Sequence, residues 1–186
     1  MSKIGEVKNG YILRYNGELV QVIEIIHRTP GNLRAFYQAK MKNLKSGKVV
    51  ENRYRADEEV DIARVEYKEL QFLYSEGPFL VLMDNESFEQ VHVPVDMFGE
   101  NAKLLKEGMI VKVAFESDLA LTAEAPNFVE LEVTYTEPGL RGDTATNTLK
   151  PATLETGAVV NVPLFVNIGE VIKIDTRDWS YMGKVK

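Results

Sequence analysis

The chain is organised by an alternation of apolar and polar residues rather than by helical periodicity. In residues 35–42 the odd positions are Ala, Tyr, Ala and Met and the even positions are Phe, Gln, Lys and Lys, which places the two sets on opposite faces of a β-strand. Runs rich in branched and aromatic residues predict further strands at 19–26, 49–54, 69–74, 79–83, 90–93, 109–115, 128–135, 158–162 and 171–175. The main helical candidate is short, at 96–106. Many short strands separated by glycine-bearing turns predict an all-β protein built from small barrels or sandwiches.

Two breaks in this pattern divide the chain into three parts. One is the acidic stretch at 57–61, and the other is the Glu-Ala-Pro-Asn sequence at 124–127. We therefore expect domains at 1–64, 65–127 and 128–186. Parts of roughly 60 residues are close to the lower limit for folding alone, so we expect them to pack on one another or to act together.

The composition excludes several structural and functional classes of protein. The chain has no cysteine, which excludes disulfides, thiolate zinc sites and cysteine nucleophiles. The N-terminus lacks the apolar core of a signal peptide, and no apolar run approaches the ~18 residues that span a bilayer. We expect a soluble, cytoplasmic protein with no membrane partner.

Charge is distributed unevenly along the chain. The formal net charge is −6, yet residues 1–64 hold 12 lysines and arginines against 8 acidic residues, and residues 65–186 hold 10 against 20. Proteins that coat nucleic acid are usually basic throughout. An acidic chain with one basic part is therefore expected to contact a polyanion locally.

The sequence contains no pattern typical of catalysis or metal binding. The two histidines, His27 and His92, lie far apart with no partner at ligand spacing, and the carboxylates are scattered. Neither a phosphate-cradling glycine motif nor a Ser/His/Asp arrangement occurs. We predict no catalytic residue, no metal and no cofactor, and we do not expect an enzyme.

The basic part contains the short turn Thr-Pro-Gly-Asn-Leu-Arg at 29–34. Pro30 and Gly31 predict a type II turn in which Gly31 supplies the positive φ of the third position. Asn32, Leu33 and Arg34 then project beyond it. Leu33 is either an exposed contact residue or a side chain folded back onto its own hairpin, and the pattern leaves both open.

Basic residues flank this turn. Arg28 precedes it, Arg34 ends it, and Lys40 and Lys42 share one face of the following strand. Together they form an elongated basic edge suited to phosphates. The alternative is a solvated hairpin without a partner.

The C-terminal part carries a distinctive motif. A long polar stretch at 137–153, broken by Pro and Gly, runs into the spaced pattern Lys150-x-Ala152, Gly157-x-x-Val160-x-Val162-Pro163, Val166 and Gly169. A loop of this length in a compact β domain is usually functional or mobile. Residues 137–177, which end in Asp-Thr-Arg, resemble the signature of bacterial translation elongation factor P. Asn9-Gly10, the segment 84–90 and the C-terminal residues Tyr181 and 184–186 also look like that family.

The resemblance implies a fold and a function. The fold is three consecutive small β-barrels in an L-shaped, tRNA-like arrangement: an N-terminal KOW-like (SH3-like) barrel that carries the 29–34 tip loop, and then two OB-fold barrels. The family is related to the hypusine-containing eukaryotic and archaeal factor. Its members bind the 70S ribosome, with its ribosomal RNA, between the P and E sites. They stabilise P-site peptidyl-tRNA, stimulate peptide-bond formation and relieve stalling at consecutive prolines; we expect a monomer.

The resemblance also assigns residues to sites. The tip that reaches the peptidyl transferase centre would be Pro30, Gly31, Asn32, Leu33 and Arg34, with Arg28, Lys40 and Lys42 as further RNA contacts. A loop that approaches the E-site codon near the small subunit would be Arg141, Gly142, Asp143, Thr144, Ala145 and Thr146. Tyr181 and Lys184 would contact RNA near the C-terminus.

Asn32 departs from the family pattern. Many members carry at this position a lysine extended by a lysyl-type group, or an arginine that carries a sugar. An amide nitrogen is not nucleophilic because its lone pair is delocalised into the carbonyl, so we predict that Asn32 is unmodified; Arg34 is a displaced alternative with a shorter reach. Two other interpretations remain: a paralogue of the same build that acts on different stalls, and another RNA-binding β-barrel protein with a different role.

Overall fold

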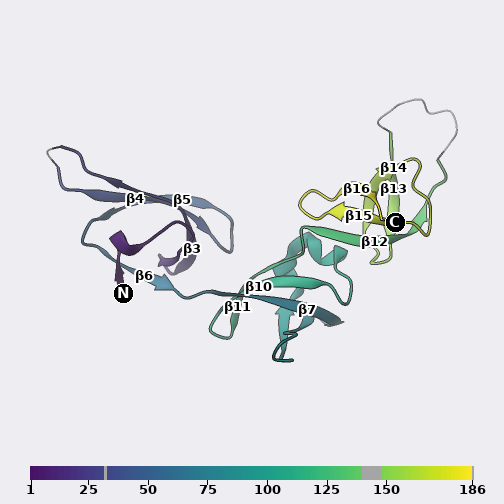
Figure 1. The fold of residues 1–186 in the computed structure, drawn as a ribbon, viewed down its shortest axis with the longest axis horizontal. Coiled ribbons are helices and arrows are strands. Elements are labelled where there is room, and N and C mark those ends of the chain that lie inside the picture. The colour runs from purple at the N-terminus through teal and green to yellow at the C-terminus, as the bar shows by residue number, and fades with distance from the viewer. Residues whose placement is uncertain (32, 140–147, 186) are drawn as a thin grey trace. The chain divides into compact units, whose positions relative to one another are not determined.

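The computed structural model describes residues 1–31, 33–139 and 148–185. Within these residues the strands form three sheets, and the helical segments are short 3-10 helices (Figure 1). The all-β class that the alternation predicted is confirmed. In this part of the chain no helix is long and apolar enough to cross a membrane.

The first sheet has six strands in the order β1-β6-β2-β3-β4-β5. Adjacent strands are antiparallel, and one face of the sheet encloses a core that includes Leu13, Val22, Met41 and Tyr54. The elements are β1 (Ser2–Lys3), η1 (Ile4–Glu6), β2 (Ile12–Tyr15), β3 (Glu18–Arg28), β4 (Phe36–Asn43), β5 (Val49–Arg55) and β6 (Glu59–Ala63).

A β-bulge interrupts the longest strand of this sheet. Val22 pairs with Met41, but Glu24 pairs with Lys40, so Ile23 is an extra residue on β3. Beyond the bulge, β3 and β4 continue as a hairpin until Arg28 pairs with Phe36 (Figure 1). This long hairpin carries the residues of the 29–34 turn at its end.

The second sheet has five strands in the order β11-β10-β7-β8-β9. The elements are β7 (Glu66–Glu76), β8 (Phe79–Met83), β9 (Gln90–Pro94), η2 (Val95–Leu104), β10 (Ile110–Glu116) and β11 (Leu119–Glu124). The predicted helix at 96–106 is wrong in type. The segment is 3-10, and it is broken at Gly99, whose φ of 57° and ψ of −142° are not helical. Phe98 and Leu104 on either side of the break are both buried, so packing sets the local conformation.

The third sheet also has five strands, in the order β14-β13-β12-β15-β16. The elements are β12 (Phe128–Thr136), β13 (Leu149–Leu154), β14 (Val159–Pro163), β15 (Val171–Asp175) and β16 (Ser180–Lys184). Strict alternation explains β12, where Val129, Leu131 and Val133 are buried and the intervening glutamates are exposed. The two edge strands β14 and β16 contact each other, which curls this sheet toward a barrel.

Strand β13 was not predicted, because Lys150-Pro151 falls in the stretch assigned to a loop. Proline lacks the N–H that a ladder needs, so it normally argues against a strand. Here the pairing of β12 with β13 ends at Thr136 and Ala152, so Pro151 lies just outside that ladder. It pairs with Asn161 on β14, and its carbonyl accepts a 2.9 Å hydrogen bond from the Thr136 hydroxyl.

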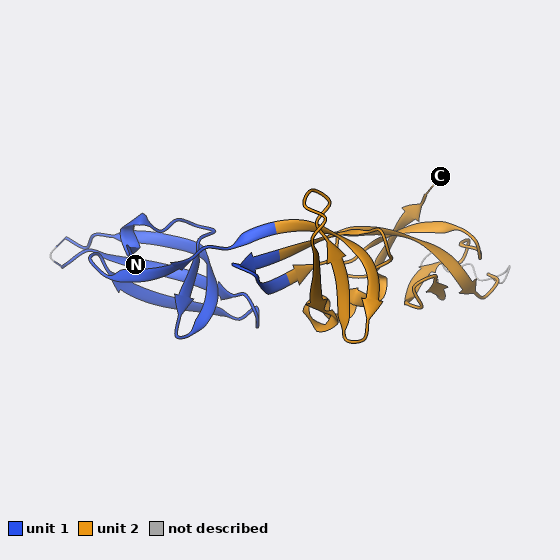
Figure 2. Ribbon diagram, turned by 90° about the horizontal axis from the view of Figure 1, so that it is seen from below, with its two compact units in different colours: residues 1–67, 114–122 blue, residues 68–113, 123–186 orange. Residues whose placement is uncertain are grey.

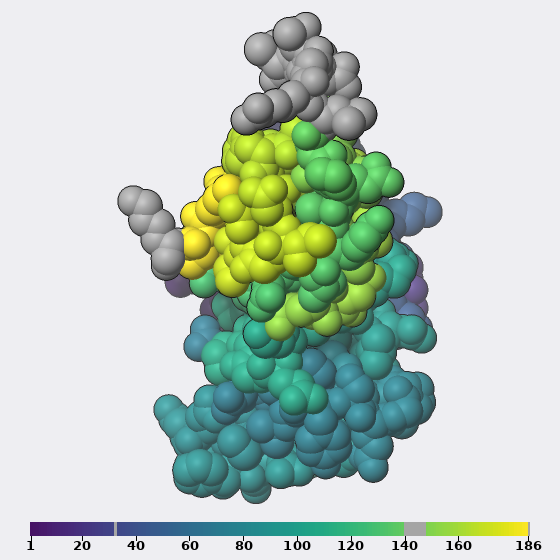
Figure 3. All heavy atoms as spheres, turned by 90° about the vertical axis from the view of Figure 1, so that its right-hand side faces the viewer, coloured from purple at the N-terminus to yellow at the C-terminus, as the bar shows by residue number. Residues whose placement is uncertain are grey.

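The chain divides into two compact units, residues 1–67 with 114–122 and residues 68–113 with 123–186 (Figure 2). The second unit holds the third sheet and most of the second. Within it, Leu104 of η2 is fully buried in the core of the third sheet. Lys106 and Glu155 form a 2.8 Å ion pair between the same two parts. Figure 3 shows residues of these two sheets, in teal and in green to yellow, forming one continuous surface.

Candidate nucleic-acid interface

The turn at the end of the β3–β4 hairpin begins one residue later than predicted. The amide of Leu33 donates a 3.2 Å hydrogen bond to the carbonyl of Pro30, so Pro30 is the first residue of the turn. Gly31 does not take the left-handed conformation. The predicted type II turn is therefore wrong. A type II assignment assumed a tight connection, whereas the ladder ends at Arg28 and Phe36 and leaves residues 29–35 to span the gap.

The described side chains of this tip are open to solvent. Leu33 is 75% exposed, so it does not fold back onto its own hairpin. Arg28 and Arg34 are exposed as well, and a Cβ added at Gly31 would meet no atom within 4 Å. Asn32 lies outside the described residues. Among the described residues, the tip thus presents an exposed leucine between two exposed arginines.

The register of the sheet brings two arginines to the tip that the sequence did not suggest. Arg28 pairs with Phe36, and Phe36 pairs with Arg55 on β5. Directly opposite residues share one face of an antiparallel sheet. Arg53 pairs with Gln38 on the same face, and its guanidinium carbon lies 5.0 Å from the centre of the Phe36 ring.

We call Arg28, Phe36, Arg53 and Arg55 the arginine face. All three arginines are exposed, and Phe36 is half-buried beneath them. Stacking on an aromatic ring fixes the plane of a guanidinium while leaving its donors available, which suits phosphate binding. The i, i+2 spacing of Arg53 and Arg55 is visible in the sequence, but it does not show which residues of β4 face them.

The two predicted lysines lie further from the tip. Lys40 pairs with Glu24 on one side and with Glu51 on the other. Lys42 pairs with Gln21 and Val49. Both lysines are exposed and share the face of Arg28, but Lys40 has carboxylates as its cross-strand neighbours. Positive charge on this face is therefore concentrated beside the tip.

The predicted E-site loop, Arg141 to Thr146, lies outside the described residues, but its two stems are well defined. Lys150 is buried, and its ammonium donates a 2.5 Å hydrogen bond to the backbone carbonyl of Glu137. Gly139 packs so closely on the backbone of Leu164 that a Cβ there would lie 2.7 Å from the Leu164 carbonyl oxygen. These contacts hold the stem residues on either side of the loop against the third sheet.

Tyr181 and Lys184 come together around a ring that the sequence did not single out. The Phe165 ring is 61% exposed and meets Tyr181 edge to face, with centroids 6.3 Å apart. Lys184 lies 5.2 Å from the centre of the Phe165 ring and forms a 2.6 Å ion pair with Glu170. The ion pair lowers the pKa of Glu170 and holds Lys184 over the ring.

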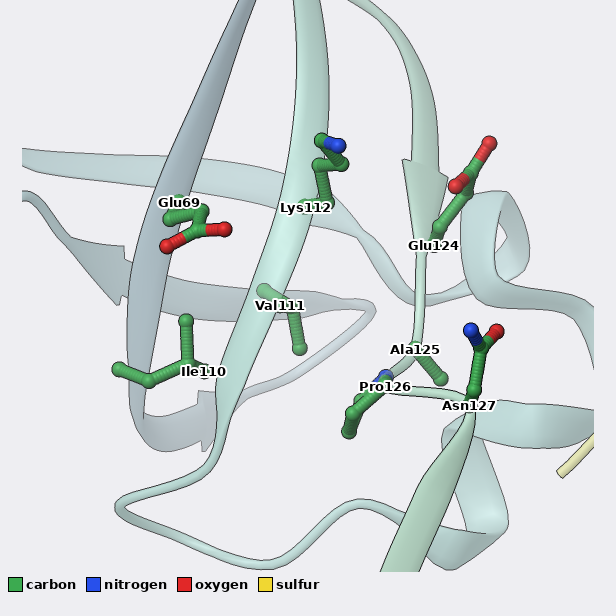
Figure 4. Close-up of a pocket in the computed structure, with 8 residues that line it drawn as sticks. All are labelled: Glu69, Ile110, Val111, Lys112, Glu124, Ala125, Pro126 and Asn127. Atoms are coloured by element: carbon green, nitrogen blue, oxygen red, sulfur yellow. The ribbon is translucent and has the colours of Figure 1, made fainter. Parts of the chain in front are cut away.

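A groove in the second unit is separate from these sites. Its cavity volume is about 280 Å³, and it contains none of the predicted site residues (Figure 4). Its charged groups are the ammonium of Lys112 and the carboxylates of Glu69 and Glu124. Because the negative charges outnumber the positive one, the groove offers no net attraction for a polyanion. The lining residues are Glu69, Ile110, Val111, Lys112, Glu124, Ala125, Pro126 and Asn127.

Three family models match successive parts of the chain. Residues 3–60 match the elongation factor P KOW-like domain, residues 65–122 match the elongation factor P OB domain, and residues 129–184 match the elongation factor P C-terminal domain. Each match falls on one of the three sheets. The KOW-like match contains the tip and the arginine face.

Full-length relatives of this chain are named elongation factor P. The chain is 47% identical over 182 residues to elongation factor P from Chloroflexus aurantiacus, covering 97% of this chain and 96% of the relative. It is 47% identical over 187 residues to elongation factor P from Chloroherpeton thalassium and 45% identical over 185 residues to that from Clostridium botulinum, covering 100% of both chains in each case.

Solved structures support the fold. A translation initiation factor 5A family protein from Naegleria fowleri aligns with a TM-score of 0.54 at 14% identity, covering 67% of this chain and 94% of that one. Eukaryotic translation initiation factor 5A from Methanococcus jannaschii aligns with a TM-score of 0.50 at 17% identity, covering 66% and 94%. At this level of identity the two structures show the fold alone. The three family models and the full-length relatives show that this chain belongs to the elongation factor P family, whose members are non-enzymatic translation factors.

Proposed function

We propose that this protein binds the 70S ribosome between the P and E sites and stabilises peptidyl-tRNA, so that peptide bonds form at consecutive prolines. Membership of the elongation factor P family implies interaction with the ribosome and tRNA. The tip would point toward the peptidyl transferase centre. The protein would act in the cytoplasm as a monomer.

The observation that carries this proposal is the arginine face beside an exposed tip. Phosphate contacts supply most of the affinity of proteins for nucleic acid and set the position of the protein on it. Arg28 of the β3–β4 hairpin and Arg53 and Arg55 of the adjacent strand β5 lie on one face of the sheet. The exposed Leu33 and Arg34 are at the end of that hairpin. A hairpin of this kind can enter a narrow space lined by RNA while its arginines bind the backbone. The acidic remainder of the chain would limit binding elsewhere.

The mechanism requires positioning rather than new chemistry. Proline is a poor nucleophile and its ring constrains the nascent chain, while the ribosome itself supplies the reaction. A factor that holds peptidyl-tRNA in a reactive geometry can contribute several kcal/mol, because orientation removes entropy from the barrier. In this proposal the arginine face holds the tRNA backbone, and Leu33 and Arg34 make the contacts nearest the reacting end.

Asn32 is proposed to act without modification. Its amide is not a nucleophile, and Arg34 lies next to the start of β4, where its reach is short. Intact mass of the protein purified from its native host tests this, with the tip peptide mapped by fragmentation. Added mass on Asn32 or Arg34 would overturn the proposal of an unmodified tip.

The remaining predicted contacts are proposed for the third sheet. The loop at 141–146 would approach the E-site codon, and its stems are held by Lys150 and Gly139. Tyr181 and Lys184 would contact RNA together with Phe165. We propose that the chain works as three domains, with boundaries near residues 64 and 127.

A polyproline reporter in a factor-deficient bacterium tests the function, with toeprinting on a Pro-Pro-Pro template in a purified system. The wild-type protein is expected to relieve the stall. The double variant Arg53→Ala/Arg55→Ala is expected to lose most of this effect. The matched control is Lys45→Ala/Lys48→Ala, which removes the same charge from the exposed turn at the other end of β4 and β5.

The outcomes separate the interpretations. If the wild-type protein leaves the stall unchanged but binds ribosomes, the protein is a paralogue that acts on other stalls. If it does neither, it is an RNA-binding barrel protein with another role. If the control loses as much activity as the arginine variant, the arginine face is not the site.

A further inference from the structure

The core-side face of strands β3, β4 and β5 carries a row of three rings. His27 pairs with Tyr37 on β4, and Tyr37 pairs with Tyr54 on β5. Tyr54 is 5% exposed in the core of the first sheet, Tyr37 is half-buried, and His27 is exposed. The row therefore leads from the core to solvent at the base of the tip.

The outer two rings are stacked. The centroids of His27 and Tyr37 are 4.5 Å apart, and their planes differ by 20°. Tyr37 is held from the other direction by the N-terminal 3-10 turn, because a Cβ at Gly5 would lie 3.1 Å from the Tyr37 hydroxyl. A fixed tyrosine thus supports an exposed imidazole, which orders the imidazole in one orientation.

We propose that this ring pair, His27 on Tyr37, is a stacking platform for an unpaired nucleobase of RNA. The inference rests on the proposed function, since it deepens the same tip. Every base has a π-face, and aromatic side chains on β-strands are the usual platforms for unpaired bases. An ordered ring costs less conformational entropy on binding than a mobile one.

The two faces of the hairpin then have different chemistry. Arg28 belongs to the arginine face, and its neighbour His27 belongs to the opposite face, because successive residues of a strand alternate. The hairpin would therefore lie between two segments of RNA. It binds the phosphates of one through the arginines and stacks a base of the other on His27. A single RNA strand on one side could use only one of these sets.

The test is equilibrium binding of the full-length protein to ribosomes that carry P-site tRNA. His27→Ala and His27→Leu are expected to weaken binding about tenfold, the loss typical of one stacked base. His27→Phe keeps a ring and is expected to bind within about twofold of the wild type, since stacking tolerates any aromatic ring. The matched control is His92→Ala, since His92 is an exposed strand histidine that meets the ring of Phe79 and pairs with Glu76 at 2.8 Å.

Salt dependence separates stacking from charge. Arg53→Ala is expected to reduce the slope of log affinity against log salt by about one unit, because it removes one phosphate contact. His27→Leu is expected to lower the affinity while leaving that slope unchanged. Melting curves of each variant confirm that the fold is intact, and His27→Leu retains side-chain volume if His27→Ala does not fold.

A second arm identifies the source of the base. The same variants are measured on ribosomes whose tRNA lacks its unpaired 3′-terminal nucleotides. If the effect of His27→Leu disappears, the base belongs to tRNA; if it persists, the base belongs to ribosomal RNA. The proposal is overturned if His27→Leu binds like the wild type on both, or if His27→Phe is as weak as His27→Leu. Failure of the wild type to bind ribosomes would instead overturn the proposed function.

Discussion

The indole nitrogen of Trp179 donates a 2.8 Å hydrogen bond to the side-chain oxygen of Asn101, which lies 78 residues away in the sequence. Trp179 belongs to the turn between β15 and β16, and Asn101 belongs to η2. The bond therefore connects the third sheet to the segment between β9 and β10 of the second sheet, within one compact unit. Trp179 also packs against the core of the third sheet.

Replacing Trp179 by Phe is expected to destabilise the second unit by about 1 kcal/mol, because the donor is lost while most of the ring contact remains. Denaturant unfolding of the wild type, Trp179→Phe, Asn101→Ala and the double variant measures this. The double variant is expected to be less destabilised than the sum of the single variants. Simple additivity would show that the hydrogen bond contributes nothing.

Gly139→Ala is expected to destabilise the protein by about 1–3 kcal/mol, the usual effect of forcing an extra methyl group into a packed site. The new Cβ would lie 2.7 Å from the carbonyl oxygen of Leu164, and backbone atoms cannot move aside easily. The matched control is Gly31→Ala, where a Cβ meets nothing within 4 Å and φ is not left-handed. Thermal unfolding compares the two, and equal melting temperatures would contradict the prediction.

Asp175 is expected to make stability depend on acid pH. Its carboxylate accepts hydrogen bonds from Arg177, at 2.9 Å from Nε and 3.0 Å from the backbone amide. The side-chain bond from Arg177, followed by the backbone bond, lowers the pKa of Asp175 from 3.8 to about 2. A carboxylate with a lowered pKa stabilises the fold above its unfolded pKa, and the contribution is lost as pH falls through the folded value.

Asp175→Asn should therefore be less stable than the wild type at neutral pH, and the difference should narrow as pH falls from about 4 to about 2, the window set by that pKa. Urea midpoints measured across this range give the comparison. Asp178→Asn is the control, because it removes a nearby carboxylate by the same substitution. If the difference in urea midpoint between Asp175→Asn and the wild type stays constant down to the lowest pH, the ion pair with Arg177 is not its cause.

Phe36→Leu is expected to weaken ribosome binding without changing stability greatly. Arg53 lies over the Phe36 ring, so removal of the ring frees the guanidinium to adopt other rotamers before it binds. A loss of about threefold to tenfold, corresponding to roughly 0.5–1.5 kcal/mol, is expected from this cation–π contact. Affinity measured in the Arg53→Ala background checks the mechanism, because there Phe36→Leu should have no further effect.

Runs of branched and aromatic residues predicted several strands accurately. The predicted runs at 79–83 and 171–175 coincide with β8 and β15. The sequence pattern did not predict β13, where Lys150 is buried although lysines normally are not, and where Pro151 suggested a break. It also predicted a helix where Gly99 divides a 3-10 segment. In these places packing overrides local preference.

The sequence predicted only part of the site, because the register between two strands cannot be read from either strand alone. The exposed tip and Arg28 follow from the turn residues alone. Arg53 and Arg55 reach the same face only through the pairing of β5 with β4, and Lys40 lies between two glutamates for the same reason. The His27–Tyr37 stack likewise depends on which residues are opposite each other.

The extra residue at Ile23 has a consequence for both faces of the hairpin. Before it, even-numbered residues such as Val20 and Val22 point into the core; after it, Ile25 and His27 share the core side and Arg28 does not. One inserted amino acid thus exchanges odd and even for the rest of the strand. The bulge absorbs this shift, because Val22 and Glu24 on either side of it pair with the successive residues Met41 and Lys40 of β4. If Ile23 instead paired regularly with Lys40, every later side chain of β3 would change face, so that His27 would turn outward and Arg28 would lie on the core side. The two distinct faces of the hairpin therefore depend on one residue that is left out of the ladder.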